Sequence, residues 1–439
     1  MLETDKLRSL YDYKLGIEYA LQEDKTDELK SYRDQFHIPK DAQGNPWIYM
    51  TGNSLGLQPK QTKTYVNQEL KDWANLGVEG HFEAKNPWLA YHEFLTESMA
   101  KIVGAKPIEV IVMNTLTANL HFMMVSFYKP TKTRYKILIE SDAFPSDKYA
   151  VESQLRHHGF DDKEGLILWK PRSGETLLNY EDLEAILEEH ANEIALIMIG
   201  GVNYYTGQFF DLKRITTLGH KHGCNVGFDC AHGAGNVALN LHDSGADFAV
   251  WCTYKYLNSG PGSLAGCFVH ERHAYNRDLN RFTGWWSHNK QTRFNMRDEF
   301  DQLPGAEGWQ LSNPPILSMA AIKASLDMFN TVGFDRLLIK SKKLTGYFEF
   351  LLKTLGEDTI KIITPSNPAE RGCQLSIQVK NADKTLHNQL TKAGIISDWR
   401  EPDVIRCAPV PLYNTFQDVY RLVERLSLVL SKPSKTQTT

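Results

Sequence analysis

Two segments of the chain each place a reactive side chain at the end of an apolar run. Residues 226–228 (Val-Gly-Phe) are followed directly by Asp229, and the apolar run 248–252 is followed closely by Lys255. Apolar runs of this length are typical of buried parallel strands, and the carboxyl ends of parallel strands meet at one edge of a sheet. We therefore expect a carboxylate and a lysine amine to lie close together.

A carboxylate and a lysine placed in this way suit pyridoxal phosphate. The lysine amine can form a Schiff base with the cofactor aldehyde, and the carboxylate can keep the pyridine nitrogen protonated, so that the ring withdraws electrons. In isolation, however, such a pair is more often a helix cap and a surface lysine. The rest of the sequence has to decide between these interpretations.

Short apolar segments alternate with helix-like segments over the first two thirds of the chain. The expected strands are 110–113, 135–139, 165–169, 194–199, 226–228, 248–252 and 265–269. The expected helices are 61–76, 91–103, 116–127, 149–157, 180–191 and 212–222. Repeated strand–helix units predict an α/β fold with a doubly wound, mostly parallel sheet.

At 439 residues the chain is longer than one hydrophobic core usually supports, so we expect more than one domain. Residues 1–50 are charged, with near-helical spacing of Leu7, Leu10, Leu15, Ile17 and Leu21, and are expected to form a helical arm that packs with the small domain. Residues 51–315 form the expected large domain. After Pro314 and Pro315 the pattern becomes two long helices, three short strands and a terminal helix, which predicts a smaller α+β domain over 316–439. The tail 431–439 is expected to be disordered.

Composition excludes several classes of partner. The net charge is -4 with both signs interspersed, and no basic stripe indicates nucleic-acid or membrane binding. No apolar stretch reaches the roughly 18 residues of a membrane span, and the N-terminus does not resemble a signal peptide. The six cysteines show no Cys-x-x-Cys spacing, which favours a reducing compartment. We expect a cytoplasmic protein that binds a small molecule.

Several histidines are candidate metal ligands. His157-His158 and His220-Lys221-His222 have no third ligand at zinc-site spacing, so no metal is expected.

Arg406 lies in an apolar strand-like run, where its charge needs a carboxylate. That carboxylate is either an internal Asp or Glu or the α-carboxylate of a substrate, and we favour the substrate because a planar guanidinium matches a carboxylate.

Eight short segments carry a family resemblance. Each is weak alone, but eight in order between residues 50 and 420 would rarely occur by chance. They are 52–57, 114–121, 144–147, 205–208, 228–232, 254–258, 284–288 and 312–315. Together they resemble the kynureninase family.

The resemblance implies a pyridoxal-phosphate enzyme with the fold of the aspartate aminotransferase superfamily (fold type I) that works as a homodimer with active sites at the subunit interface. The implied reaction is hydrolysis of the Cβ–Cγ bond of L-kynurenine or 3-hydroxy-L-kynurenine, which gives anthranilate or 3-hydroxyanthranilate and L-alanine. This reaction belongs to tryptophan catabolism and de novo NAD synthesis.

The resemblance also assigns roles to individual residues. Lys255 would bind the cofactor aldehyde and Asp229 the pyridine nitrogen. Tyr205 is a candidate general acid, its hydroxyl could equally cap a loop, and a contact with the cofactor is favoured over both roles. Further cofactor contacts are implied for Leu116, Thr117, Phe144, Pro145, Ser146, Asp147, Gly200, His232, Tyr254, Trp285 and Asn313, with Trp285 and Asn313 expected from the second subunit. Substrate contacts are implied for Ser54, His81, Asn313 and Arg406.

One position departs from the family pattern. Gly200 stands where some relatives have a serine that contacts the cofactor phosphate, so one hydrogen bond, about 1 kcal/mol, is expected to be missing.

Two rival functions remain at this point. A cysteine desulfurase or selenocysteine lyase of the same superfamily could use Cys373 as its nucleophile, but Ser54 and His81 would have no clear use with so small a substrate. A protein that retains the fold without chemistry would not need the Asp229 and Lys255 pair. Replacing Cys373 by alanine separates the first rival from a kynureninase.

Overall fold

The computed structural model describes residues 11–431, and these residues divide into two compact units. The large unit comprises Gln61–Tyr204 and Phe209–Thr331, and the small unit comprises the described residues up to Lys60, the segment Tyr205–Gln208 and the described residues from Val332 on. Leu7 and Leu10 of the expected arm, and nearly all of the expected disordered tail, lie outside the described residues.

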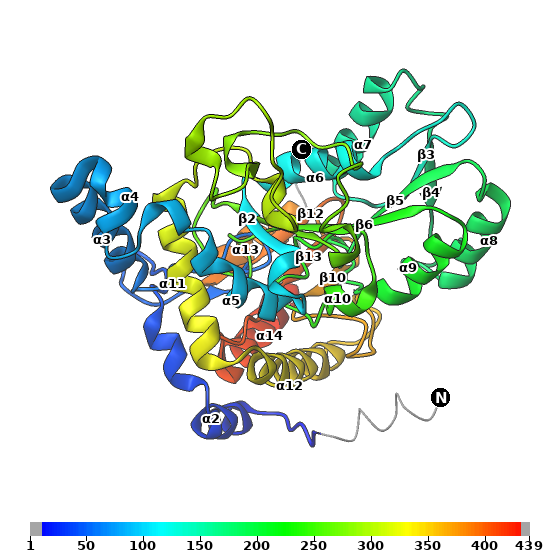
Figure 1. Ribbon diagram of the computed structural model, residues 1–439. Coiled ribbons are helices and arrows are strands. Elements are labelled where there is room, and N and C mark those ends of the chain that lie inside the picture. The colour runs from blue at the N-terminus through cyan, green and yellow to red at the C-terminus, as the bar shows by residue number, and fades with distance from the viewer. Residues whose placement is uncertain (1–10, 432–439) are drawn as a thin grey trace, which may run out of the picture. The chain divides into compact units, whose positions relative to one another are not determined.

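The large unit is built on a seven-stranded sheet, which confirms the expected fold class. In spatial order its strands are β2 (Val110–Met113), β8 (Ala265–Val269), β7 (Phe248–Cys252), β6 (Asn225–Asp229), β5 (Ile194–Gly200), β3 (Lys136–Glu140) and β4 (Leu166–Trp169). All neighbours are parallel except the two pairs that β8 makes. In Figure 1, β3, β4, β5 and β6 lie side by side, and α8 and α9 run along them. The central strands are buried on both faces, as their unbroken apolar runs predict.

Nine α-helices of the large unit surround or extend this sheet. They are α3 (Thr62–Leu76), α4 (Gly80–Glu83), α5 (Glu93–Val103), α6 (Leu116–Phe127), α7 (Pro145–His157), α8 (Tyr180–His190), α9 (Leu212–Lys221), α10 (Leu241–Ser244) and, except for its last residue, α11 (Ile316–Val332). Helix α7 begins four residues before the expected start at Tyr149, because Pro145 occupies the first helical position, where its missing N–H costs nothing.

Helix α11 belongs to the large unit, whereas the sequence placed it in the small domain. The side chain of Gln61 donates to the carbonyl oxygen of Ala324 (2.5 Å), and the hydroxyl of Tyr65 donates to Asp327 (2.7 Å), so α11 is bonded to the start of α3. Pro314 and Pro315 precede α11 but do not mark the end of the large unit.

The small unit carries an antiparallel four-stranded sheet. Its spatial order is β12 (Asp398–Arg400), β13 (Val404–Cys407), β10 (Leu375–Val379) and β9 (Ile360–Ile362), and β1 (Ile48–Tyr49) pairs in parallel with β11 (Ile395–Ile396). Its α-helices are α2 (Ile17–Thr26), α12 (Phe334–Lys353), α13 (Lys384–Lys392) and α14 (Phe416–Leu430). The expected α+β character of this part of the chain is confirmed.

The two faces of the four-stranded sheet differ in chemistry. Leu375, Ile377 and Val379 of β10 are buried in an apolar cluster that also contains residues of α12 and α14. Side chains alternate along a strand, so Ser376 points to the opposite face. Ser376 pairs with Arg406, and Arg406 with Asp398, so these polar side chains share that face.

The segment Tyr205–Gln208 joins the small unit through hydrogen bonds. The hydroxyl of Ser376 donates to the carbonyl oxygen of Tyr205 (2.5 Å), and that of Thr364 donates to the carbonyl oxygen of Thr206 (2.6 Å). Gly207 has a φ of 78°, which a glycine adopts without strain. A tight turn in the middle of the chain is therefore bound to β10 and to the segment just after β9, both of which come much later in the sequence.

Candidate active site

A cavity in the large unit lies where β3, β5, β6 and β7 end. Ten residues expected to contact a cofactor line this cavity: Leu116, Thr117, Phe144, Ser146, Asp147, Gly200, Asp229, His232, Tyr254 and Lys255. Four further lining residues were not expected: Glu140, Val202, Tyr204 and Ala231. The carboxyl edge of the sheet is where open α/β folds commonly bind ligands.

The lysine and the carboxylate at the centre of the prediction both face this cavity. Nζ of Lys255 lies 3.0 Å from Nε2 of His232. Asp229, the last residue of β6, is buried, and its carboxylate accepts a hydrogen bond from the backbone N–H of Ala231 (2.7 Å). The imidazole is thus in position to exchange a proton with the amine.

Three acids share the cavity, and burial raises the pKa of each. The pKa of Asp147 is raised well above its usual range, first by burial and then by the neighbouring charge of Asp229. Burial also raises the pKa of Asp229, against the lowering effects of the Ala231 N–H and Lys255. Burial raises the pKa of Glu140 from 4.5 to about 7. A cationic group in this cavity would lower these pKa values again, because a nearby positive charge favours the ionised form of a carboxyl group.

The start of α6 offers donors for an anion. No side chain caps this helix, and the backbone N–H of Asn119 is the first to bond within it, to the carbonyl oxygen of Thr115. The amides of Leu116 and Thr117 thus belong to the first turn, where N–H groups and the helix dipole stabilise a phosphate. The hydroxyls of Thr117 and Ser146 lie 3.1 Å apart and border the same end of the cavity.

Aromatic side chains flank the cavity. The ring of Phe144 is 6.0 Å from Nζ of Lys255 and meets Tyr204 edge-on, with 5.2 Å between ring centroids. Burial raises the pKa of Tyr254 well above its usual range, so its phenol stays protonated and can donate a hydrogen bond. Together with the acids, the amine and the first turn of α6, this donor set fits a planar, phosphorylated, cationic ring such as pyridoxal phosphate.

The contacts of Gly200 explain why a glycine occupies this position. Its N–H donates to both carboxylate oxygens of Glu140 (3.1 and 3.2 Å), and a Cβ atom at position 200 would lie 2.8 Å from one of them. Any side chain at this position therefore requires Glu140 to move.

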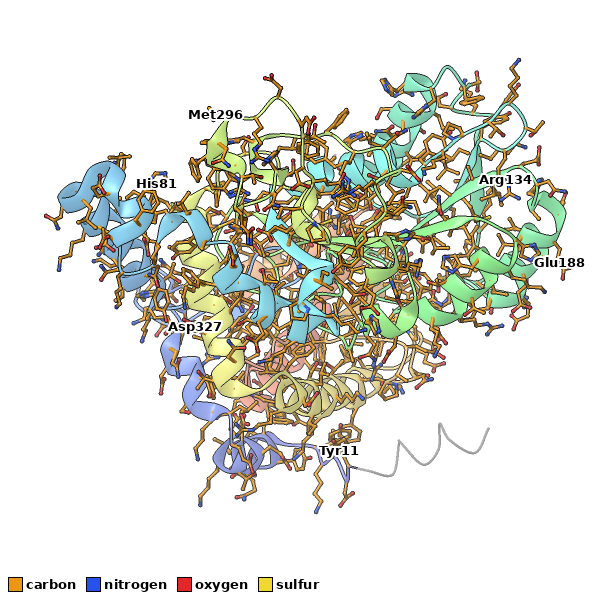
Figure 2. All side chains as sticks on the ribbon, viewed as in Figure 1. Tyr11, His81, Arg134, Glu188, Met296 and Asp327 are labelled. Carbon is orange, nitrogen blue, oxygen red and sulfur yellow. The ribbon has the colours of Figure 1, made fainter. Side chains whose placement is uncertain are left out.

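Several expected site residues lie elsewhere in the large unit. Pro145 starts α7, and Trp285 and Asn313 are both solvent-exposed and outside the cavity lining. His81 lies on α4, where its Nδ1 is 3.1 Å from the carbonyl oxygen of Val78. Figure 2 shows His81 at the end of the large unit opposite to Arg134 and Glu188.

Ser54, Tyr205 and Arg406 belong to the small unit. Ser54 is exposed, and Tyr205 lies in the segment held by Ser376. Arg406 is 1% exposed, and its guanidinium donates to the carboxylate of Asp398. The internal acid that the sequence left open as an alternative partner of Arg406 is thus present.

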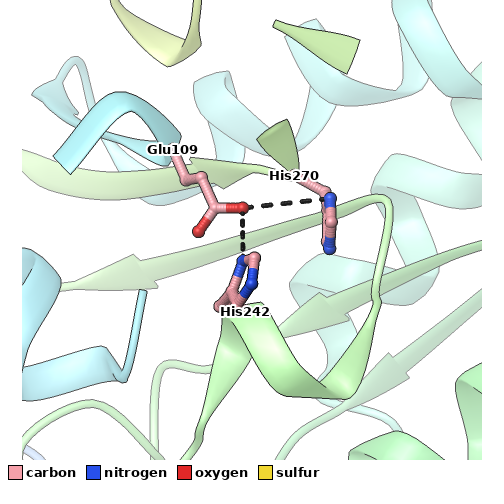
Figure 3. A group of neighbouring side chains, drawn as sticks. All are labelled: Glu109, His242 and His270. Atoms are coloured by element: carbon pink, nitrogen blue, oxygen red, sulfur yellow. Dashed lines mark hydrogen bonds and ion pairs between the residues drawn. The ribbon is translucent and has the colours of Figure 1, made fainter. Parts of the chain in front are cut away.

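Among residues 11–431, two groups of side chains resemble metal sites. They are His92 with Glu93 and Glu307, and Glu109 with His242 and His270; in each group the potential ligand atoms lie within 4.8 Å of one another. Figure 3 shows a carboxylate oxygen of Glu109 facing both histidines. That oxygen accepts from Nδ1 of His242 (2.9 Å) and from the backbone N–H of Glu271 (2.8 Å), and Nδ1 of His270 accepts from the backbone N–H of Arg272 (3.2 Å). Hydrogen bonds account for this cluster without an ion.

Sequence similarity to known proteins identifies the family of this chain. The kynureninase of Myxococcus xanthus is 58% identical over 416 residues, which cover 95% of this chain and 98% of that protein. The kynureninases of Koribacter versatilis and Flavobacterium psychrophilum are 53% and 52% identical, over 93% and 92% of this chain and 96% of each relative. The chain belongs to the kynureninase family. A family profile described as "Kynureninase C-terminal domain" also matches residues 337–426.

The chain shares its fold with more distant enzymes. The cystine C-S lyase C-DES in complex with cysteine persulfide matches with a TM-score of 0.73 at 15% identity, covering 87% of this chain and 97% of that one. The cysteine desulfurase CsdA of Escherichia coli matches with a TM-score of 0.73 at 16% identity, covering 92% and 98%. At such identities the likeness shows the fold alone, and this is the expected fold type I.

The expected enzyme class and cofactor are therefore confirmed: the protein is a pyridoxal-phosphate-dependent hydrolase of a carbon–carbon bond. The desulfurase alternative receives support from fold only. Cys373, its expected nucleophile, is 1% exposed, whereas an attacking thiolate must be accessible.

Proposed function

We propose that this enzyme hydrolyses the Cβ–Cγ bond of L-kynurenine, 3-hydroxy-L-kynurenine or both. One water is consumed: the aromatic fragment leaves as anthranilate or 3-hydroxyanthranilate, and the remaining three carbons leave as L-alanine. The reaction would serve tryptophan catabolism and de novo NAD synthesis. The observation that supports this proposal most is the cavity that joins Lys255 to Asp229 in a chain so similar to kynureninases.

Lys255 would act first as the attachment point of the cofactor and then as a base. When bound, pyridoxal phosphate supplies an electron-withdrawing ring that stabilises negative charge next to the α-carbon of an amino acid. Nζ of Lys255 would take the α-proton, and His232, 3.0 Å away, would accept or return a proton at that atom. Asp229 would hold the proton on the ring nitrogen.

The other proposed residues would contact the cofactor phosphate, the cofactor ring or the substrate. Leu116, Thr117, Ser146 and Tyr254 would bind the phosphate, Phe144 and Asp147 would flank the ring, and Gly200 and His232 would complete the pocket. Arg406 would bind the α-carboxylate of the substrate, and the hydroxyl of Tyr205 would donate a proton during cleavage.

The choice between the two substrates depends on the contacts to the aromatic ring. Ser54, His81 and Asn313 are the proposed ring contacts, and one hydrogen bond to the ring hydroxyl changes selectivity by about tenfold. Variants of these three residues, assayed with both substrates, would show which side chain sets the preference.

A homodimer is part of the proposal. Large exposed apolar side chains of the large unit concentrate in two stretches, 70–94 and 282–300, which include Trp73, Val78, Phe82, Phe294 and Met296. Exposed apolar side chains gathered in this way favour burial against a second copy. Trp285 and Asn313 would then reach the active site of the partner subunit, as the exposure of both residues allows. Light scattering during gel filtration measures the mass that decides this point.

We also propose that the enzyme works in the cytoplasm, in line with six cysteines that are all buried and none of which forms a disulfide. No helix within residues 11–431 combines the length and the apolarity that a membrane crossing requires.

The deciding experiment uses pure protein loaded with pyridoxal phosphate and each of the two substrates in turn. Aromatic acid and alanine should appear in equal amounts, and Lys255→Ala should abolish both. A bound cofactor without product from either substrate would overturn the proposed reaction and leave the cofactor assignment standing.

A further inference from the structure

Glu140 is a third acid of the cofactor cavity, beside Asp147 and Asp229, and the proposed reaction gives it no role. It ends β3, is 3% exposed and lines the cavity. Glutamates are seldom buried to this extent unless a partner compensates their charge. The contacts of this carboxyl group therefore indicate what it does.

Gly200 of β5 holds the carboxyl group of Glu140 in place. Its N–H donates to both carboxyl oxygens, and a Cβ atom at position 200 would lie 2.8 Å from one of them. The carboxyl group thus occupies the space that a side chain at position 200 would fill. Gly200 is also the direct neighbour of Asp229 in the pairing of β5 with β6. Glu140 therefore reaches across β5 toward the acid that is proposed to hold the ring nitrogen.

The carboxyl group of Glu140 has a donor but no cation. Within residues 11–431, no lysine, arginine or histidine forms an ion pair with it. Asp229 of β6 and Asp142 in the turn after β3 face it, and the charges of both raise its pKa. Trp169, its neighbour on β4, carries no charge. Four further titratable residues line the same cavity: Asp147, His232, Tyr254 and Lys255.

Two other buried acids of the large unit show the difference. Asp247 is 3% exposed and accepts hydrogen bonds from His220 and Arg272, and Glu109 is 0% exposed and accepts one from His242. A buried carboxylate without such a partner is costly, so without cofactor Glu140 favours its protonated form. A cation that enters the cavity supplies the partner that Glu140 does not have within the protein.

We propose that Glu140 is a further cofactor-site residue, held by Gly200, that releases its proton when the cationic ring of pyridoxal phosphate binds beside Asp229. The positive charge of the ring favours the ionised form of a nearby carboxyl group. The phosphate has its own proposed donors at the start of α6. This coupling goes beyond the proposed reaction, because it holds for whichever amino acid is cleaved, but it rests on the proposed position of the ring nitrogen at Asp229.

The test measures the Kd of the cofactor-free, full-length protein for pyridoxal phosphate as a function of pH. If binding releases a proton, a lower pH weakens binding. Because burial raises the pKa of Glu140 to about 7, the Kd of the unaltered protein should rise about tenfold more from pH 8 to pH 6 than the Kd of Glu140→Gln. Proton changes of the cofactor and of Lys255 are common to both proteins and cancel in this comparison.

Glu188→Gln is the control for this titration. Glu188 is exposed on α8, and Figure 2 shows it far from His81, near the edge of the large unit. Its replacement removes an equal charge outside the cavity and should leave the pH dependence of the unaltered protein as it is. The same pH dependence in Glu140→Gln and in the unaltered protein would overturn the inference.

Gly200→Ala tests whether Gly200 holds the carboxyl group. The added Cβ atom displaces that group, so in the Gly200→Ala background the change Glu140→Gln should alter the pH dependence of the Kd less than about twofold. The full tenfold difference in this background would show that Glu140 acts without Gly200 and would overturn the proposed arrangement.

A direct measurement keeps the inference testable if Glu140→Gln does not fold. The unaltered protein is isotope-labelled at the carboxyl carbon of glutamate, so that infrared bands of Asp147 and Asp229 do not shift with the label. Addition of pyridoxal phosphate at about pH 6 should remove a labelled band of a protonated carboxyl group. An unchanged band would overturn the inference.

The outcomes also separate this inference from the proposed function. If the unaltered protein does not bind pyridoxal phosphate, the cofactor site itself is wrong and the inference is overturned with it. If the cofactor binds with the expected pH dependence but neither kynurenine is cleaved, only the proposed reaction fails.

Discussion

The cavity of the large unit gathers acids, whereas the polar face of the small-unit sheet gathers arginines. In the cavity, Glu140, Asp147 and Asp229 surround one amine, that of Lys255. On the sheet face, Arg400 and Arg406 share Asp398. A protonated ring nitrogen suits the first region, because a nearby cation favours the ionised form of a carboxyl group, and an α-carboxylate is proposed as a ligand of Arg406 in the second.

The largest expected effect comes from removing the amine of the acidic cavity. Lys255→Ala should lower turnover by about 10⁴-fold or more, since both the cofactor attachment and the base are lost. Product formation measures the effect. Lys148→Ala, on the exposed side of α7, is the matched control and should keep full activity. Substantial turnover by Lys255→Ala would mean that the cavity is not the site of chemistry.

The two faces of β10 should differ in their contribution to stability. Ile377→Ala should lower the free energy of unfolding by about 4 kcal/mol, because it leaves a cavity in the apolar cluster. Ser376→Ala, on the polar face, removes two hydrogen bonds, one donated to Tyr205 and one accepted from Gln374, and should cost about 2 kcal/mol. Denaturant unfolding measures both, and equal losses would contradict the division of the sheet into an apolar and a polar face.

Glu140 should make the stability of the cofactor-free protein depend on pH. Burial raises its pKa from 4.5 to about 7, so between these values the folded protein keeps a proton that the unfolded chain has lost. Its stabilising effect is present below pH 4.5 and is lost as the pH rises to about 7, an effect of about 3 kcal/mol.

Glu140→Gln should remove this part of the pH dependence. The free energy of unfolding of the variant and of the unaltered protein, measured from pH 4.5 to 7, should diverge by this amount. The exposed change Glu164→Gln serves as control and should leave the slope as it is. Parallel curves for Glu140→Gln would show that the carboxyl is ionised throughout.

The smallest expected effect concerns the phosphate end of the cavity. Thr117→Val removes a hydroxyl at the start of α6 and should weaken pyridoxal phosphate about tenfold, the value of one hydrogen bond to a charged group. Titration of the cofactor-free protein, followed by visible absorbance, measures the affinity. Thr115→Val changes the exposed neighbour outside the cavity and should have no effect; equal losses would indicate a general disturbance of the helix.

Much of the large unit follows from local pattern. The expected bounds of β2, β7, β8 and α6 agree with the structure, because each begins or ends where an apolar run meets a polar residue. The antiparallel direction of β8 and the pairing of β1 with β11 could not be predicted, since they depend on contacts between distant segments. For the same reason, the side on which α11 packs was misjudged.

The candidate site was predictable where chemistry and pattern coincide. Asp229 and Lys255 were found because each follows an apolar run, and Glu140 ends the run 136–139 in the same way but was overlooked. Ser54, His81 and Trp285 carry no such signal, and only the family resemblance pointed to them. No local pattern in the sequence predicts the contact between Asp398 and Arg406, because the two residues lie on different strands.

The assembly of the small unit limits how the chain can be cut. A fragment starting at Val332 would lack β1, whose partner β11 lies almost 350 residues away, and would also lack the 205–208 turn. Contacts so distant in sequence form slowly, because a long loop must close first. On a ribosome, residues 11–60 would have to wait for the last fifth of the chain. We therefore expect the small unit to be the last part to mature and a poor candidate for expression as a separate fragment.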